Sequence, residues 1–227
     1  MIRKVVCFDL DDTLYKEMDF LKSGYRKVAE MVSKRYYLDA QEVYASLLSW
    51  YHQGKNPFET LNETYRIDNP ISDYLNVYRY HQPSLVLSAE VRGVLTSLKE
   101  QGVLMGIISD GRELTQKNKI EALDLSEWID PDLVLINEDK KHFKPNRWSY
   151  DRLMLKCFEK SVEADAAFYY VGDNTEKDFL APNQMGWKTI CLEDDGRNIH
   201  KQNFEIAEEY LPQNIIKNIV ELMDIIR

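Results

Sequence analysis

From Ser88 onward, segments with helical spacing alternate with short apolar segments rich in β-branched residues. Such alternation is typical of a parallel sheet with helices on both faces, joined by right-handed crossover connections. The expected helices of this part cover residues 88–100, 113–123, 147–159 and 177–184, and its expected strands cover 103–109, 133–136, 167–171 and 188–192. One more strand is expected earlier in the chain, over residues 5–10. An amphipathic helix is expected over 214–227. The pattern therefore predicts an α/β fold built on a parallel sheet.

Residues 15–86 interrupt this pattern with helical signals alone. Helix starts are indicated by Asp39 with Glu42 three residues later, by Asn56-Pro57 with Glu59, and by Ser72. Residues 15–83 hold 10 of the 14 tyrosines, which favours aromatic packing in a small helical bundle, although Tyr15 or Tyr25 is also suited to face a pocket. We therefore expect two domains: residues 1–14 with 87–227 form the α/β core, and residues 15–86 form an inserted helical domain.

The bulk composition restricts the class of protein. The net charge of −9 and pI of about 5.1 disfavour nucleic-acid binding, but they remain compatible with a small phosphorylated substrate held by a local lysine and a metal. The three cysteines are widely spaced, which argues against disulfides and a zinc site and favours a reducing cytoplasm. The pattern shows neither a signal peptide nor a membrane-spanning segment. It indicates no oligomeric state.

The candidate functional residues lie where the expected strands end, except for Lys144, which lies in the loop before the helix expected over 147–159. In order along the chain they are Asp9, Asp11, Asp12, Ser109, Asp110, Gly111, Lys144, Asp173 and Asp178. Ligands bind at the carboxyl ends of parallel strands, so these residues are expected at one edge of one sheet. Carboxylates forced together repel one another unless a cation joins them, and an all-oxygen cluster beside a phosphate favours Mg²⁺. The arrangement predicts phosphoryl transfer, with a carboxylate as nucleophile and a second acid for proton transfer.

The segment Asp9-Leu10-Asp11-Asp12-Thr13-Leu14 resembles the signature of the haloacid dehalogenase-like superfamily. Ile107-Ile108-Ser109, Lys144-Pro145 and the segment from Gly172 to Asp178 resemble its other three motifs, in the family's order. The resemblance spans most of residues 5–192 and implies a Rossmann-like core with a C1-type helical cap.

The resemblance also implies roles for individual residues. Asp9 would be nucleophile and metal ligand, and Asp11 would be general acid/base, with its backbone carbonyl also on the metal. Lys144 would stabilise the phosphate and the intermediate. The phosphate would be bound by Ser109, Asp110, Gly111 and Lys144, and Mg²⁺ by Asp9, Asp11, Asp173 and Asp178. For Asp178 the resemblance leaves three alternatives open: direct binding, binding through water, or orientation of its neighbours. Family members often carry Asn where this chain has Asp110; contact there is usually through backbone amides.

Each of these residues also has a plainer interpretation. Asp12 alone is best read as a structural cap or a solvated turn residue. Ser109 alone would most often be a helix cap, and a lone lysine such as Lys144 is most often a surface group. Asp178 is also suited to stabilising an early helical turn through the macrodipole. The joint occurrence of the motifs is what favours the functional interpretation.

The leading hypothesis is a Mg²⁺-dependent phosphatase that hydrolyses a small phosphomonoester through an aspartyl phosphate on Asp9. A phosphosugar mutase on the same scaffold is the first alternative, and the sequence separates the two poorly. A dehalogenase is less favoured, because those relatives lack the second acid, here Asp11. A non-catalytic binding protein is also less favoured, because Asp9 and Lys144 are both present. The identity of the substrate is not readable from the pattern.

Overall fold

The computed structural model describes residues 2–226 and divides the chain into two compact units. The first unit comprises Met1–Glu17 and Val86–Arg227, and the second comprises Met18–Leu85. Each unit has its own buried core, described separately below.

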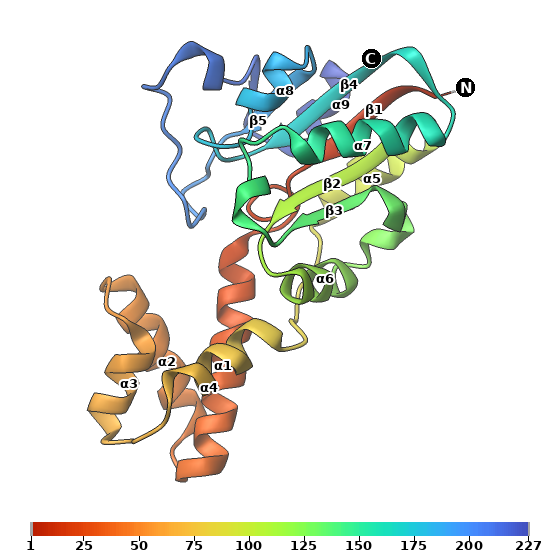
Figure 1. Ribbon diagram of the computed structural model, residues 1–227. Helices are drawn as coiled ribbons and strands as arrows, with labels where there is room; N and C mark the ends of the chain where they lie inside the picture. Colours follow the sequence, from red (N-terminus) through yellow and green to blue (C-terminus); the bar gives the residue numbers. More distant parts are fainter. Residues whose placement is uncertain (1, 227) are drawn as a thin grey trace. The chain divides into compact units, whose positions relative to one another are not determined.

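A six-stranded parallel sheet forms the centre of the first unit (Figure 1). The strand order is β3-β2-β1-β4-β5-β6. The strands are β1 (Ile2–Phe8), β2 (Leu104–Asp110), β3 (Val134–Asn137), β4 (Val162–Gly172), β5 (Lys188–Leu192) and β6 (Asn214–Ile216). Val5 to Phe8 of β1 are completely buried, as expected for apolar residues in a central strand covered on both faces.

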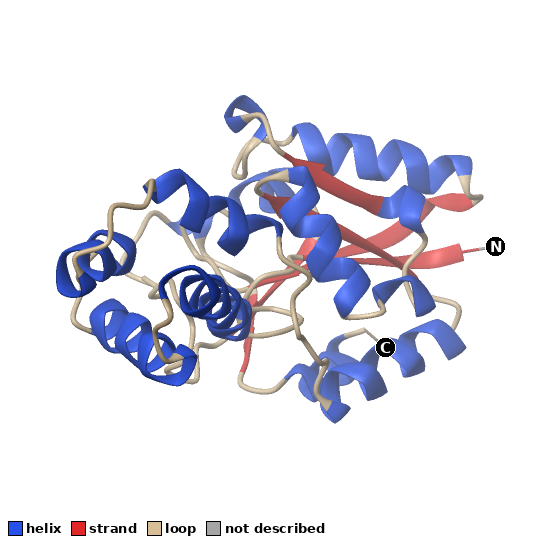
Figure 2. Cartoon of the chain, turned by 90° about the horizontal axis from the view of Figure 1, so that it is seen from below, coloured by secondary structure: helices blue, strands red, loops and turns tan. Residues whose placement is uncertain are grey.

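Helices cover both faces of this sheet (Figures 1 and 2), which confirms the predicted α/β class. The helices of this unit are α5 (Ala89–Glu100), α6 (Glu113–Ala122), α7 (Trp148–Glu159), α8 (Leu180–Gln184) and α9 (Leu222–Ile225). Tyr150 and Leu153 of α7 join a buried cluster with Val5 and Cys7 of β1. In Figure 1, α5 lies on the face opposite α7.

The second unit is helical. It is built from α1 (Glu17–Tyr36), α2 (Ala40–His52), α3 (Pro57–Tyr65) and α4 (Ile71–Tyr80), with the first residue of α1 counted in the sheet unit. Asp39 accepts a hydrogen bond from the Glu42 amide at 2.8 Å, and the Asn56 side chain caps α3. Tyr25 packs against the rings of Tyr51, Phe58 and Tyr78, so part of the tyrosine set forms an aromatic cluster. Tyr37, by contrast, is 95% exposed and lies outside this packing.

Several predicted elements differ from the structure; the strand expected over 167–171, for example, begins at Val162. The expected helix over 214–227 is wrong within the described residues, because Asn214–Ile216 pairs with β5 as an edge strand. Two β-branched isoleucines favour that extended segment. Asn218 then caps a 3-10 helix, leaving only Leu222–Ile225 as α-helix.

The helix expected from Lys177 begins only at Leu180, because the Asp178 side chain bonds the Asn174 amide in a turn. The first strand ends at Phe8 rather than Leu10, and Asp12 turns the chain with a φ of 56°. The three cysteines are free thiols, as predicted. None of the described helices is long and apolar enough to cross a membrane.

Candidate active site

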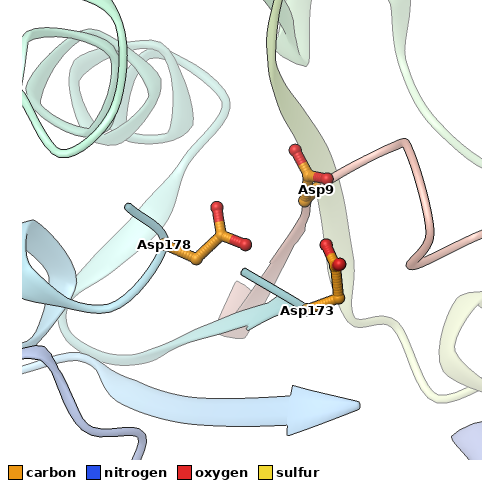
Figure 3. Close-up of side chains that lie close together, drawn as sticks. All are labelled: Asp9, Asp173 and Asp178. Carbon is orange, nitrogen blue, oxygen red and sulfur yellow. The ribbon is translucent and has the colours of Figure 1, made fainter. Parts of the chain in front are cut away.

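Three aspartates from the ends of two neighbouring strands point toward one another (Figure 3). Asp9 follows β1, and its backbone amide donates to Val171 of β4 at 2.8 Å. Asp173 follows β4, and Asp178 lies in the turn beyond it. Each contributes a ligand atom, and these atoms lie within 4.8 Å of one another. The sheet edge therefore brings together three of the four predicted metal ligands as side chains.

The glycine that ends β4 makes this convergence possible. A Cβ on Gly172 would lie 2.5 Å from the Asp178 Oδ2 atom and 3.0 Å from its Cβ. These distances are far inside ordinary contact, so any side chain at position 172 would push Asp178 out of place.

A buried lysine completes the cluster. The Lys144 ammonium contacts the carboxylate of Asp9, lies 2.7 Å from Asp178 Oδ1, and donates to the Tyr170 hydroxyl at 3.0 Å. The Lys144 side chain is fully buried, so the interpretation of Lys144 as a solvated surface lysine does not hold. Burial lowers the pKa of Lys144, but Asp178 and Asp9 outweigh burial and leave that pKa well above its usual value.

Two of the three acids, Asp9 and Asp173, have raised pKa values, whereas the pKa of Asp178 is lowered. Burial raises the pKa of Asp9 to about 6 in spite of the opposing charge of Lys144. Burial, Asp178 and Asp9 together raise the pKa of Asp173 to about 9. Lys144, together with the charge of Lys177, therefore does not fully balance three acids. An oxygen-lined cluster that carries excess negative charge fits a hard divalent cation such as Mg²⁺.

Asp11 is directed to a different set of partners. It accepts from Lys119 Nζ at 2.7 Å, from Gln116 Nε2 at 2.8 Å, and from the Tyr15 hydroxyl. Burial raises the pKa of Asp11, but the charge and hydrogen bond of Lys119 dominate together with Tyr15 and Gln116, so that pKa is lowered overall. Asp11 is thus held ionised, two residues from Asp9, with its side chain outside the three-aspartate cluster.

The predicted phosphate-binding residues lie at the end of β2. Ser109 is buried, and its hydroxyl accepts from Gln116 Nε2 at 2.6 Å. Gln116 therefore links Ser109 to Asp11. Gly111 has a φ of 147° and donates its amide to the Asn137 carbonyl at 2.8 Å. That backbone conformation favours glycine.

Both oxygens of the Asp110 carboxylate accept hydrogen bonds from other residues of the chain. One oxygen accepts from the Asn137 side chain at 2.8 Å, and the other accepts from the Lys144 backbone amide at 3.0 Å. Asn137 in turn accepts from the Ser149 hydroxyl at 2.5 Å. The side chain of Asp110 thus ties the end of β2 to the loop that carries Lys144.

Asp12 is buried and acts as a structural cap, one of the two plainer interpretations given for it. Its carboxylate accepts from the backbone amides of Glu17 and Ile199, each at 2.9 Å. It therefore fixes the start of α1 and a segment near the end of the chain.

Sequence reasoning did not assign the partners Gln116, Lys119 and Asn198. The first two lie on α6, where helical spacing gave a weak signal: residues 116 and 119 are one turn apart and share a face. Asn198 bonds to Asp173 at 3.1 Å from a segment with no regular structure, so no pattern in the sequence indicated it.

Glu17 is a further residue near the site to which the sequence analysis gave no role. It lies at the first position of α1, in the same electrostatic environment as Asp11. Burial and the Asp11 charge raise the pKa of Glu17 to about 7.

A sequence model of the haloacid dehalogenase-like hydrolase family matches residues 6–192 of the chain. Among curated proteins, the chain is similar to a glyceraldehyde 3-phosphate phosphatase of Pyrococcus abyssi. The two are 30% identical over 196 residues, which cover 82% of this chain and 80% of that protein. It is also 25% identical to the putative pyrophosphatase PpaX of Caldanaerobacter subterraneus, over 98% of this chain and 94% of that protein.

Among solved structures, the fold is similar to that of the putative HAD-hydrolase YfnB of Bacillus subtilis bound to magnesium. The TM-score is 0.65 with 17% identity, and the alignment covers 100% of each chain. At this identity the likeness concerns the fold alone.

Proposed function

Because this chain belongs to the haloacid dehalogenase-like hydrolase family, we propose that it is a Mg²⁺-dependent phosphatase that hydrolyses a small phosphomonoester through an aspartyl phosphate on Asp9. The observation that carries the proposal is the position of the Asp9 carboxylate. It is buried, it contacts the Lys144 ammonium, and it shares a cluster with Asp173 and Asp178. A nucleophile in such a place can meet a phosphate whose charge is already compensated.

Asp9, Asp173 and Asp178 would hold the ion. When bound, Mg²⁺ would supply positive charge to phosphate oxygens and remove the repulsion within the cluster. The Asp11 backbone carbonyl is proposed as a further ligand, as the family resemblance implies. Lys144 contributes a fixed positive charge beside Asp9, and Ser109 with the backbone after it would bind the phosphate oxygens.

In the first half of the reaction, an Asp9 carboxylate oxygen attacks phosphorus while the bond from phosphorus to the alkoxide of the substrate breaks. Asp11, in its protonated form, gives its proton to the departing oxygen. The negative charge of a bound phosphate would raise the pKa of Asp11. This change would oppose the effect of Lys119, which lowers that pKa.

In the second half, water attacks the phosphorus of the aspartyl phosphate and the Asp11 carboxylate takes its proton. The bond from phosphorus to Asp9 breaks, releasing inorganic phosphate and restoring the Asp9 carboxylate. The hydrogen bonds from Lys119, Gln116 and Tyr15 hold Asp11 in the ionised state that this step requires. The same residue thus serves as acid and then as base.

The relatives suggest where a substrate search should begin. We propose a small phosphorylated metabolite, and glyceraldehyde 3-phosphate is the first to test, with pyrophosphate as the second. Hydrolysis releases inorganic phosphate, whereas a mutase would convert a sugar phosphate into its isomer. Product analysis on sugar phosphates therefore separates these two functions.

The proposed function is tested with Asp9→Asn. This variant keeps the shape of the side chain but removes the nucleophilic carboxylate, so release of phosphate from p-nitrophenyl phosphate should fall by at least about 10³-fold. The matched control is Asp165→Asn, an exposed acid on β4, which should keep full activity. Circular dichroism checks that both variants fold. Substantial turnover in folded Asp9→Asn would exclude Asp9 as nucleophile.

A further inference from the structure

Residues 194–202 extend from the end of β5 back to the aspartate cluster, within the sheet unit (blue in Figure 1). They lie beyond residues 6–192, the part of the chain that matches the family. Two anchors hold this segment in place. The Ile199 amide donates to Asp12 at 2.9 Å, and Gln202 Nε2 donates to the carbonyls of Asp173 and Leu192, each at 2.7 Å.

Between these anchors, the Asn198 side chain bridges a cation and an acid. Lys16 Nζ donates to Asn198 Oδ1 at 2.6 Å, and Asn198 Nδ2 donates to Asp173 Oδ2 at 3.1 Å. The orientation of the amide follows from chemistry, because an ammonium only donates and therefore must face the amide oxygen. The amide nitrogen is then left to face Asp173. The Asn198 backbone amide also donates to Asp194 at 3.0 Å, which fixes the residue within its loop.

We propose that Asn198 is a positioning residue for Asp173 and that segment 194–202 presets the metal centre for Mg²⁺. The inference rests on the proposed function, since it assumes that Asp173 is a metal ligand. Asp173 is repelled by Asp9 and Asp178, so without a partner its carboxylate would turn away from them. The hydrogen bond from Asn198 to Oδ2 opposes this rotation, and one hydrogen bond still leaves lone pairs of the carboxylate for an ion. Lys16 strengthens the bond by polarising the amide.

Residues 194–202, which lie outside the part of the chain that matches the family, would thus orient a metal ligand. Residues that orient metal ligands typically change metal affinity by about 10- to 100-fold when removed. The effect is expected mainly on affinity, because Asn198 contacts the carboxylate of Asp173 rather than the nucleophile Asp9. Raising the Mg²⁺ concentration should therefore restore turnover.

The test measures Mn²⁺ binding to the purified chain by electron paramagnetic resonance, with Mn²⁺ standing in for Mg²⁺ because both prefer oxygen ligands. Asn198→Ala should weaken Mn²⁺ binding by about 10-fold or more. Asn198→Leu, which keeps a similar volume but has no polar atoms, should do the same. His200→Ala, an exposed neighbour in the same segment, should bind as the wild type does. Melting of the metal-free proteins shows whether each variant is folded.

A second readout separates positioning from a general structural role. With p-nitrophenyl phosphate, Asn198→Ala should need about 10-fold more Mg²⁺ for half-maximal activity, while kcat at saturating Mg²⁺ stays close to the wild-type value. Wild-type Mn²⁺ affinity in a folded Asn198→Ala or Asn198→Leu variant would overturn the inference, and so would a loss of kcat that excess Mg²⁺ does not restore. If the wild type itself binds no Mn²⁺, the metal centre of the proposed function fails and this inference fails with it.

Discussion

At the scale of single residues, Asp110 connects two parts of the site that are distant in sequence. Its carboxylate accepts from Asn137 and from the backbone of Lys144. In Asp110→Ala both donors lose their acceptor, and the loop that places the Lys144 ammonium is released. Because small misplacements of a catalytic group are costly, kcat on p-nitrophenyl phosphate should fall by about 10²-fold.

Asp110→Asn is the matched control for this prediction. An asparagine still accepts from the Lys144 amide, and its own NH₂ can donate to Asn137 once the Asn137 amide flips. The Ser149 hydroxyl then accepts from Asn137 instead of donating to it. The kcat of Asp110→Asn should therefore stay near that of the wild type. Equal loss in both variants would show that the negative charge of Asp110 matters rather than its hydrogen bonds.

The residues of the candidate site that belong to motifs could be predicted from the sequence. The residues whose role depends on tertiary contacts could not. Asp9 and Asp173 stand directly after apolar strands, so their meeting at one sheet edge was predictable from topology. Lys119 reaches Asp11 across 108 positions of sequence, and Asn198 reaches Asp173 across 25. A lysine on a helix carries only a weak local signal for such a contact, from its spacing with Gln116, and an asparagine in a loop carries none.

At the scale of elements, we use the close contact between Gly172, the last residue of β4, and the Asp178 side chain to predict the effect of a substitution. Gly172→Ala would force its new methyl group against Asp178, so the free energy of unfolding should fall by about 1–3 kcal/mol. Binding of Mn²⁺ should weaken as well, because Asp178 is displaced from the cluster. Urea unfolding and Mn²⁺ titration measure the two effects.

Gly93→Ala provides the control for that experiment. Gly93 lies within α5, and a Cβ built there meets nothing within 4 Å. Alanine in a helix interior should stabilise the protein by about 0.5–1 kcal/mol without changing metal binding. Similar stability changes in the two variants would contradict the packing argument at Gly172.

Helices could be predicted from sequence where apolar residues recur at helical spacing and a capping residue marks the start of the helix. Ser88 caps α5 and Asn56 caps α3, each where the pattern placed a helix start. The end of the chain was not predictable in the same way. Residues 214–216 become a strand because the open edge of β5 offers hydrogen bonds, and that edge exists only in the assembled sheet.

At the scale of the whole molecule, the burial of several acids in one place makes the stability of the metal-free protein depend on pH. The pKa is raised to about 6 for Asp9, to about 7 for Glu17 and to about 9 for Asp173, in each case by burial first. Between pH 4 and these values the folded protein therefore holds more protons than the unfolded chain. Stability falls with rising pH wherever the folded state binds more protons.

The stabilising contribution of these three groups is fully present below their ordinary pKa near 4 and is lost as pH rises through about 6 to 9. Asp11 and Asp178, whose pKa values are lowered, act only at more acidic pH and do not oppose this trend. With EDTA present, the melting temperature should therefore be lower at about pH 8.5 than at about pH 5.5. Mg²⁺ should raise it most at the higher pH, because the ion binds the deprotonated acids.

Asp173→Asn is the variant that tests the origin of this dependence. The amide keeps the shape of the side chain but does not titrate, so the largest of the three contributions disappears. Without metal, this variant should melt at least as high as the wild type near pH 8.5, because repulsion from Asp9 and Asp178 is relieved. It should also lose most of the stabilisation by Mg²⁺. A wild-type melting temperature that rises with pH in EDTA would mean that the acids are not destabilised by their burial, and the electrostatic case for a metal at this sheet edge would fall with it.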